Sequence, residues 1–209
     1  IVFVDATDSD AFGSVIAEVP VGPMPDAVDL SDDGRRVAVA NERDGPDAWG
    51  KCLVPTAVPS ISIVDVSEGP AKAKELHRVE MKDTDTGPRE PEGVVFGKDG
   101  DLVVATLQDS HEVVLFRVSA LADRAAPTSA DTTIVRLPAN ALGAFPWPDG
   151  VARFEDAKGQ ERFVTAGEWN DSFTVLDGAG AIVSTTEVSD RDIPSDLPRV
   201  VDAGSPLFS

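Results

Sequence analysis

The chain has 209 residues, of which 18 are Lys or Arg and 37 are Asp or Glu, so its formal net charge is -19. An acidic chain without a basic run is not typical of proteins that bind nucleic acid or an anionic membrane surface. Hydrophobic residues make up 42% and charged residues 26% of the chain, as in globular proteins. We therefore expect a folded protein whose partners are cations or basic surfaces.

The cysteine content and the apolar runs bear on where the protein is found. The single cysteine, Cys52, cannot form an internal disulfide, so it leaves the redox compartment open. No run approaches the roughly 18 uninterrupted apolar residues of a membrane span. The residues after Ile1 lack the pattern of a secretion signal, which predicts a mature or trimmed chain with no membrane span in this segment.

One unit recurs three times along the chain. Its copies cover Pro25–Glu42, Pro91–Gln108 and Pro148–Glu168. Each copy has two apolar-rich runs around a turn such as Asp33-Gly34, where Gly takes positive φ without a Cβ clash. A third and a fourth apolar-rich run follow each copy. Four antiparallel strands in a repeat of roughly 40 to 50 residues are typical of a β-propeller blade.

The phase of these repeats predicts an all-β fold, a β-propeller of four-stranded antiparallel blades. The chain holds about three and a half blades of an incomplete ring, so we expect further blades or another chain to complete it. Short helical turns are expected at 71–76 and 119–124. The predicted units are a half blade of third and fourth strands at 1–22, whole blades at 25–81, 91–137 and 148–189, and a tail or the start of a next blade at 190–209.

Polar side chains gather at one end of the predicted blades. The first strand of a blade lies nearest the axis, and the loop before it opens on the same face as the loop between the second and third strands. We call this face the mouth. Two sets of residues are expected there. The acids that begin the first strands are Asp26, Glu92 and Asp149. The residues that follow the second strands are Glu42, Arg43, Asp44, Gln108, Asp109, Glu168, Trp169, Asn170 and Asp171.

This array of oxygens favours a hard cation such as calcium, which takes six to eight oxygen ligands. Carboxylates held together without a counter-ion raise one another's pKa and cost stability. The alternative interpretation is that the acids end strands in water, in a chain rich in acid throughout. The candidate metal ligands are Glu42, Asp44, Glu92, Asp109, Glu168 and Asp171. The acidic loops 5–10 and 83–87 lack the late Glu of an EF-hand and are interpreted as solvated turns.

Other chemistries find less support in the sequence. The two histidines are His77 and His111. Ser110 precedes His111, but neighbouring side chains on an extended chain point to opposite faces and do not meet, so we assign no catalytic residue. One alternative is a metal-dependent phosphoesterase, alkaline phosphatase-like or phytase-like, with ligands Glu42, Asp44, Glu92, Glu168 and Asp171. A second is a glycan-binding module built on Trp49, Trp147 and Trp169. Asn170 begins a glycosylation acceptor pattern in a loop expected to be exposed.

The motifs PDAV, SDDGRRVAVANE, EPEGVVF, DGDLVVATLQ, PDGVARFE and ERFVTAGE resemble the choice-of-anchor I propellers over Gly13–Asp177. That family includes mesenchyme-specific cell-surface glycoproteins and alkaline phosphatase-like bacterial proteins. The resemblance implies an extracellular or cell-surface propeller, often with a variable C-terminal anchor. Arg43 stands where a small Gly is usual, and 167–171 differs from an Asn-Glu-Gly-Asp type segment. We predict a non-enzymatic assembly or ligand-binding module, stabilised by calcium.

Overall fold

A computed structural model describes residues 1–7, 9–43, 58–84, 87–122, 124–168 and 170–188. They form one two-stranded and three four-stranded antiparallel sheets. The two-stranded sheet is β1 (Val2–Val4) and β2 (Val15–Glu18). The first blade is β3 (Pro25–Leu30), β4 (Arg36–Asn41), β5 (Ser60–Asp65) and β6 (Lys74–Glu80). The second is β7 (Pro91–Phe96), β8 (Leu102–Leu107), β9 (Glu112–Arg117) and β10 (Thr133–Arg136). The third is β11 (Pro148–Glu155), β12 (Glu161–Gly167), β13 (Ser172–Leu176) and β14 (Ile182–Glu187).

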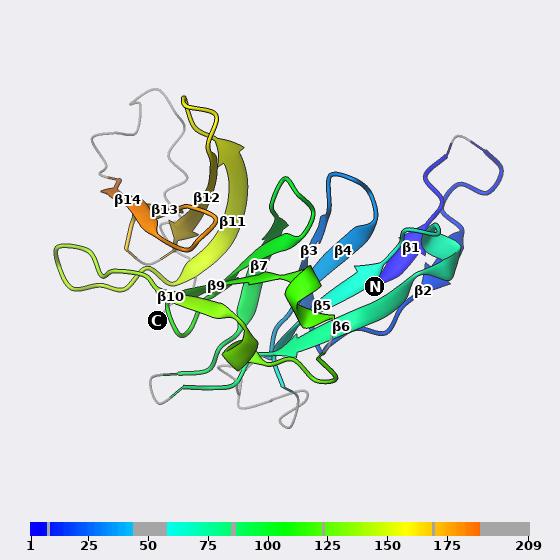
Figure 1. Ribbon diagram of the computed structural model, residues 1–209, viewed down its shortest axis with the longest axis horizontal. Helices are drawn as coiled ribbons and strands as arrows, with labels where there is room; N and C mark the ends of the chain where they lie inside the picture. Colours follow the sequence, from blue (N-terminus) through cyan, green and yellow to red (C-terminus); the bar gives the residue numbers. More distant parts are fainter. Residues whose placement is uncertain (8, 44–57, 85–86, 123, 169, 189–209) are drawn as a thin grey trace, which may run out of the picture.

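The sheets follow one another like the blades of a fan (Figure 1). Within each blade the strands pair in chain order, and the first strands of neighbouring blades meet because β3 and β11 both contact β7. The predicted all-β fold of four-stranded antiparallel blades is therefore confirmed. The described residues do not close a ring, as the repeat phase predicts.

Short 3-10 helices connect the strands: η1 (Pro70–Lys72), η2 (Val118–Leu121) and η3 (Ser129–Asp131). Two of them lie near the predicted helical turns. The expected turn at 71–76 is wrong in its second half, because Lys74 and Glu75 already pair with β5 as the start of β6. Strand pairing satisfies the backbone groups there, so a helix is not needed.

The second strands of the first and second blades are buried on both faces. In β4, Ala38 and Ala40 pack into the cluster shared with the second blade, whereas Val37 and Val39 pack toward β1 and β2. Side chains alternate between the faces of a strand, so a strand sandwiched between two neighbours is rich in apolar residues on both faces. This explains the apolar-rich runs that the sequence shows, such as Leu102–Leu107 in β8, in which Thr106 is the one polar residue.

The far end of the blades, opposite the mouth, is tied by an ion pair. Arg153 of β11 donates from Nη2 to both carboxylate oxygens of Asp32, at 2.9 and 2.7 Å, and so joins the third blade to the first. Beside it, Nζ of Lys98 from the second blade lies 2.6 Å from Oε1 of Glu155. Because these ion pairs are partly exposed they add little stability, and the packing of β3 and β11 on β7 sets the arrangement of the first strands.

Candidate cation-binding site

The mouth is built by one hydrogen bond that recurs in every blade. The carbonyl before the initial proline accepts from the backbone N–H of the residue that follows the second strand. This bond closes the hairpin of first and second strands and brings the residue after the second strand beside the acid that begins the first. The three bonds are Glu42 to Met24 at 3.0 Å, Gln108 to Glu90 at 3.1 Å and Glu168 to Trp147 at 3.1 Å.

The acid that begins each first strand lies in a β-bulge. Pro25 pairs with Asn41 and Ala27 with Ala40, so Asp26 has no partner of its own in the ladder. The register shifts at the same place in β7, between Pro91 and Val94, and in β11, between Pro148 and Val151. A bulge turns a side chain out of the regular alternation of a strand. The repeat therefore releases Asp26, Glu92 and Asp149 from the sheet at equivalent positions.

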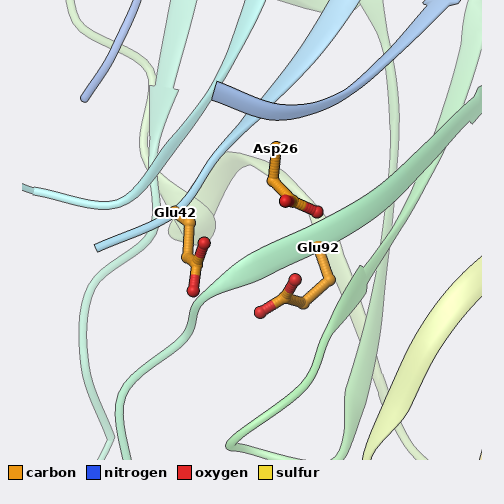
Figure 2. A group of neighbouring side chains, drawn as sticks. All are labelled: Asp26, Glu42 and Glu92. Carbon is orange, nitrogen blue, oxygen red and sulfur yellow. The ribbon is translucent and has the colours of Figure 1, made fainter. Parts of the chain in front are cut away.

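Three carboxylates meet where the first and second blades join. Oxygens of Asp26, Glu42 and Glu92 all lie within 4.8 Å of one another, and we call these residues the acidic centre. Figure 2 shows the three side chains converging on one space from β3, from the residue after β4, and from β7. Asp26 is exposed and the other two are half-buried, so the centre is open to an ion from solvent.

The electrostatic field of the centre is strongly negative. Burial raises the pKa of the Glu92 carboxyl to about 8, with further contributions from the charges of Glu42, Asp26 and Asp149. A carboxyl whose pKa is this high holds a proton at neutral pH, because burial and the neighbouring negative charges both disfavour its ionised form. A divalent cation would replace that proton and remove the repulsion.

A second carboxyl lies beside the centre. Glu90 is 5% exposed, and burial raises its pKa to about 8, with the charges of Asp109 and Glu42 adding to the effect. The cation near it is Arg43, whose Nε lies 3.9 Å from Oε1 of Glu90. That oxygen is buried and accepts no hydrogen bond from the described residues. The sequence analysis missed Glu90, although only the second repeat carries an acid directly before its proline.

A close backbone contact sets the position of Glu92 relative to the third blade. A Cβ on Gly93 would lie 2.7 Å from the carbonyl oxygen of Asp149 and 3.0 Å from the backbone nitrogen of Val151. The Thr106 hydroxyl, fully buried, accepts from the Gly93 N–H at 2.7 Å and donates to the Asp149 carbonyl. Only glycine lets β7 approach β11 this closely.

The remaining predicted mouth residues are spread more widely. Nε2 of Gln108 donates to Oε2 of Glu168 at 3.2 Å, and this hydrogen bond joins the second blade to the third. Arg43 donates from Nη2 to both oxygens of Asp83, at 3.2 and 3.1 Å. The backbone of Asp171 takes positive φ, and its carbonyl accepts from the N–H of Val188. Asp44, Trp49, Cys52 and Trp169 lie outside the described residues.

Asn170 is placed differently from the exposed loop expected for a glycosylation acceptor. It is 4% exposed, its Oδ1 accepts from the Ser172 hydroxyl at 2.6 Å, and its Nδ2 donates to the Ala144 carbonyl. The Asn170 amide packs directly on Gly167, since a Cβ on that glycine would lie 2.4 Å from Oδ1. A glycan on this amide is incompatible with the folded arrangement.

His111, the histidine that follows Ser110, lies in an aromatic cluster. The ring of His111 stacks on Phe145 at 4.9 Å and meets Trp147 edge-on at 5.2 Å. Burial and the nearby Arg136 lower the pKa of His111. The Ser110 hydroxyl donates to the Leu107 carbonyl at 3.4 Å instead of to the imidazole. In this part of the chain, then, Ser110 and His111 do not form a nucleophile and base.

Fold and mouth together define a β-propeller segment with an acidic inner rim. The sequence profile of the choice-of-anchor I domain matches residues 1–112, more than half of the chain, so the chain belongs to the choice-of-anchor I family. No match was found among curated protein sequences. Within the described residues, no helix has the length and apolar character that a membrane crossing requires.

Two solved structures share this fold at low identity. Hydrazine synthase of Kuenenia stuttgartiensis is 15% identical with a TM-score of 0.52, over 75% of this chain and 46% of that one. The periplasmic gluconolactonase PpgL of Pseudomonas aeruginosa is 18% identical with a TM-score of 0.51, over 83% of this chain and 44% of that one. The chain thus spans less than half the length of the structures it matches.

Proposed function

We propose that this chain is a non-enzymatic, surface-exposed propeller module whose acidic centre binds a calcium ion. The observation that carries the proposal is the convergence of Asp26, Glu42 and Glu92 from two blades, with oxygens within 4.8 Å of one another. An ion bound there would join the first blade to the second through side chains of both. Its role is to stabilise the module and to hold the shape of the mouth for a further ligand.

The spacing of the carboxylates is compatible with calcium, whose coordination shell accepts an irregular set of oxygens more readily than that of magnesium. Two oxygens on one calcium ion lie at most about 5 Å apart, which is twice a bond length of about 2.4 Å. The corresponding limit for magnesium is about 4.2 Å, and magnesium also demands near-ideal octahedral geometry. Three carboxylates leave room for water or backbone oxygens to complete six to eight ligands. The nearby Asp149, whose charge acts on Glu92, lies on the same rim.

An extracellular or cell-surface location agrees with this choice of ion. The family to which the chain belongs takes its name from a variable anchor. Calcium sites in extracellular modules have dissociation constants of roughly 0.1 to 1 mM, which suits a site with three carboxylates and partial exposure. The net charge of -19 adds a long-range attraction for cations.

Calcium is expected to raise the melting temperature of the protein. At about 100 times its dissociation constant a ligand adds about 2.7 kcal/mol to the free energy of unfolding. For a chain of this size that corresponds to about 5 to 10 °C. Thermal unfolding and calorimetry with calcium measure the effect, and Glu42→Gln should remove most of it. The matched control is Glu18→Gln on β2, which changes the net charge equally and should keep the wild-type response.

The same material separates the proposal from a metal-dependent phosphoesterase. We expect no chelator-sensitive turnover of a phosphomonoester in wild-type protein with calcium. Turnover that a chelator abolishes and that Glu42→Gln loses would contradict the non-enzymatic assignment. Absence of both binding heat and a thermal shift would contradict the calcium site itself.

A further inference from the structure

A buried carboxyl beside the acidic centre lacks a full set of partners. The side chain of Glu90 is 7% exposed, and its Oε1 accepts no hydrogen bond from the described residues. Glu112, which is buried to a similar degree, accepts from Nε of Arg89 at 2.8 Å. A buried carboxyl oxygen that has lost its water and gained no donor costs stability. The Glu90 oxygen therefore indicates a place where a cation can bind.

A second carboxyl adjoins Glu90. Burial is the first cause of the raised pKa of Glu90, and the charge of Asp109 and a hydrogen bond between the two carboxyls come next. We call Glu90 and Asp109 the carboxyl pair. Two neighbouring carboxylates can both bind one hard cation, each through one or two oxygens. The charge of Glu42 also acts on Glu90, so the carboxyl pair lies next to the acidic centre.

The guanidinium of Arg43 lies at the carboxyl pair. Its Nε is 3.9 Å from Oε1 of Glu90, which is close enough for an ion pair but too far for a hydrogen bond. Its Nη2 donates to both oxygens of Asp83, at 3.2 and 3.1 Å. The contact with Asp83 thus tethers a positive charge next to Glu90, yet that charge leaves the Glu90 oxygen without a donor.

We propose that Glu90 and Asp109 form a second divalent-cation site next to the acidic centre, and that the tethered guanidinium of Arg43 fills it as a resident counter-ion. The inference rests on the calcium site proposed above and sets its capacity, because Arg43 limits the mouth to one ion. A guanidinium keeps its charge at every pH at which proteins fold, and it repels calcium at short range. Arg43 directly follows Glu42, so adjacent residues supply a ligand to one site and the counter-ion to the other.

Replacing Arg43 with Gln should open the second site. We expect wild-type protein to bind about one calcium ion and Arg43→Gln to bind about two, because the carboxyl pair then needs another cation. The dissociation constant of the first ion should also fall by about fivefold, since a nearby positive charge is gone. Equilibrium dialysis against millimolar calcium counts the ions. A background of about 0.5 M sodium chloride screens diffuse binding to the acidic surface.

Three controls separate the charge of Arg43 from its contacts. Arg43→Lys keeps the positive charge and should bind one ion, as the wild type does. The double variant Arg43→Gln with Glu90→Gln should return to one ion, which assigns the second ion to the carboxyl pair. Arg35→Gln removes an exposed arginine at the turn between β3 and β4, at the end opposite the mouth. It changes the net charge equally and should keep the wild-type count.

Two different failures are distinguishable. Wild-type protein that binds no calcium would contradict the acidic centre. An Arg43→Gln protein that binds the same number of ions as the wild type would overturn the inference about Arg43. Two ions in Arg43→Lys would overturn it as well, because the positive charge would then not be what fills the second site.

Discussion

Replacing Glu92 with Gln is expected to stabilise the protein at pH 8 in the presence of a chelator and to abolish its response to calcium. The amide removes a buried charge that Glu42 and Asp26 repel, and it also removes a ligand. Because Glu92 is half-buried and water screens part of the repulsion, we expect a gain of about 1 to 2 kcal/mol, or about 3 to 6 °C in melting temperature. Higher stability in chelator together with loss of calcium binding is the result expected for a metal ligand that its neighbours repel.

The pH dependence of the wild type follows from the same pKa. The folded protein keeps a proton on Glu92 up to about pH 8, whereas an unfolded glutamate releases it near pH 4.5. Between these values the folded state binds more protons, so the free energy of unfolding falls as the pH rises. Glu90, whose pKa is also raised to about 8, adds a loss in the same window. Melting temperatures from pH 5 to pH 8 in chelator measure this slope, which Glu92→Gln should reduce.

The control for this prediction is again Glu18→Gln, an exposed position on β2 that leaves the acidic centre intact. It should keep both the wild-type slope and the calcium response. A Glu92→Gln protein that is less stable than wild type at pH 8 in chelator would show that the carboxylate is already neutralised within the fold. The account of a repulsive acidic centre would then be wrong.

Gly93→Ala is expected to destabilise the protein by about 3 kcal/mol. The new Cβ would lie 2.7 Å from the Asp149 carbonyl oxygen and 3.0 Å from the Val151 nitrogen. Both are backbone atoms, so they cannot swing aside as a side chain would, and the contact between β7 and β11 must open. The shift would also disturb the hydrogen bonds that Thr106 makes to both strands. Chemical denaturation followed by circular dichroism measures the loss.

The repeat supplies a matched control in Gly150, which holds the same place in the third blade. A Cβ there meets no atom within 4 Å, so Gly150→Ala should be neutral or stabilising by up to about 1 kcal/mol. Equal losses in the two variants would mean that backbone conformation, rather than the approach of neighbouring blades, requires glycine. Equal and negligible losses would mean that the blades are not packed as described.

Much of the fold could be predicted because the repeat carries its own signals. Proline, an acid, an apolar-rich run and a Gly turn recur in order, and apolar-rich runs such as Leu102–Leu107 indicate strands buried on both faces. The starting point of each first strand could also be predicted from Pro25, Pro91 and Pro148. The start of β6 could not, because its residues Lys74 and Glu75 are polar and resemble a connector.

The acidic centre was predictable only in part. Equivalent positions in a repeat place Asp26, Glu42 and Glu92 at one mouth, but sequence alone does not say which members approach one another. Which oxygens converge depends on the angle between the first and second blades, where β3 and β4 pack against β7. The burial of Glu90 and of Asn170 depends on loops whose course no repeat specifies.

The most direct measurement is a crystal structure of the protein grown with calcium, with anomalous scattering used to locate the ion. The account predicts a peak bound by carboxylate oxygens of Asp26, Glu42 and Glu92 at about 2.3 to 2.6 Å. The same crystals of Glu92→Gln should lack that peak. Well-ordered side chains at the acidic centre with no bound ion at millimolar calcium, or an ion bound only elsewhere, would contradict it.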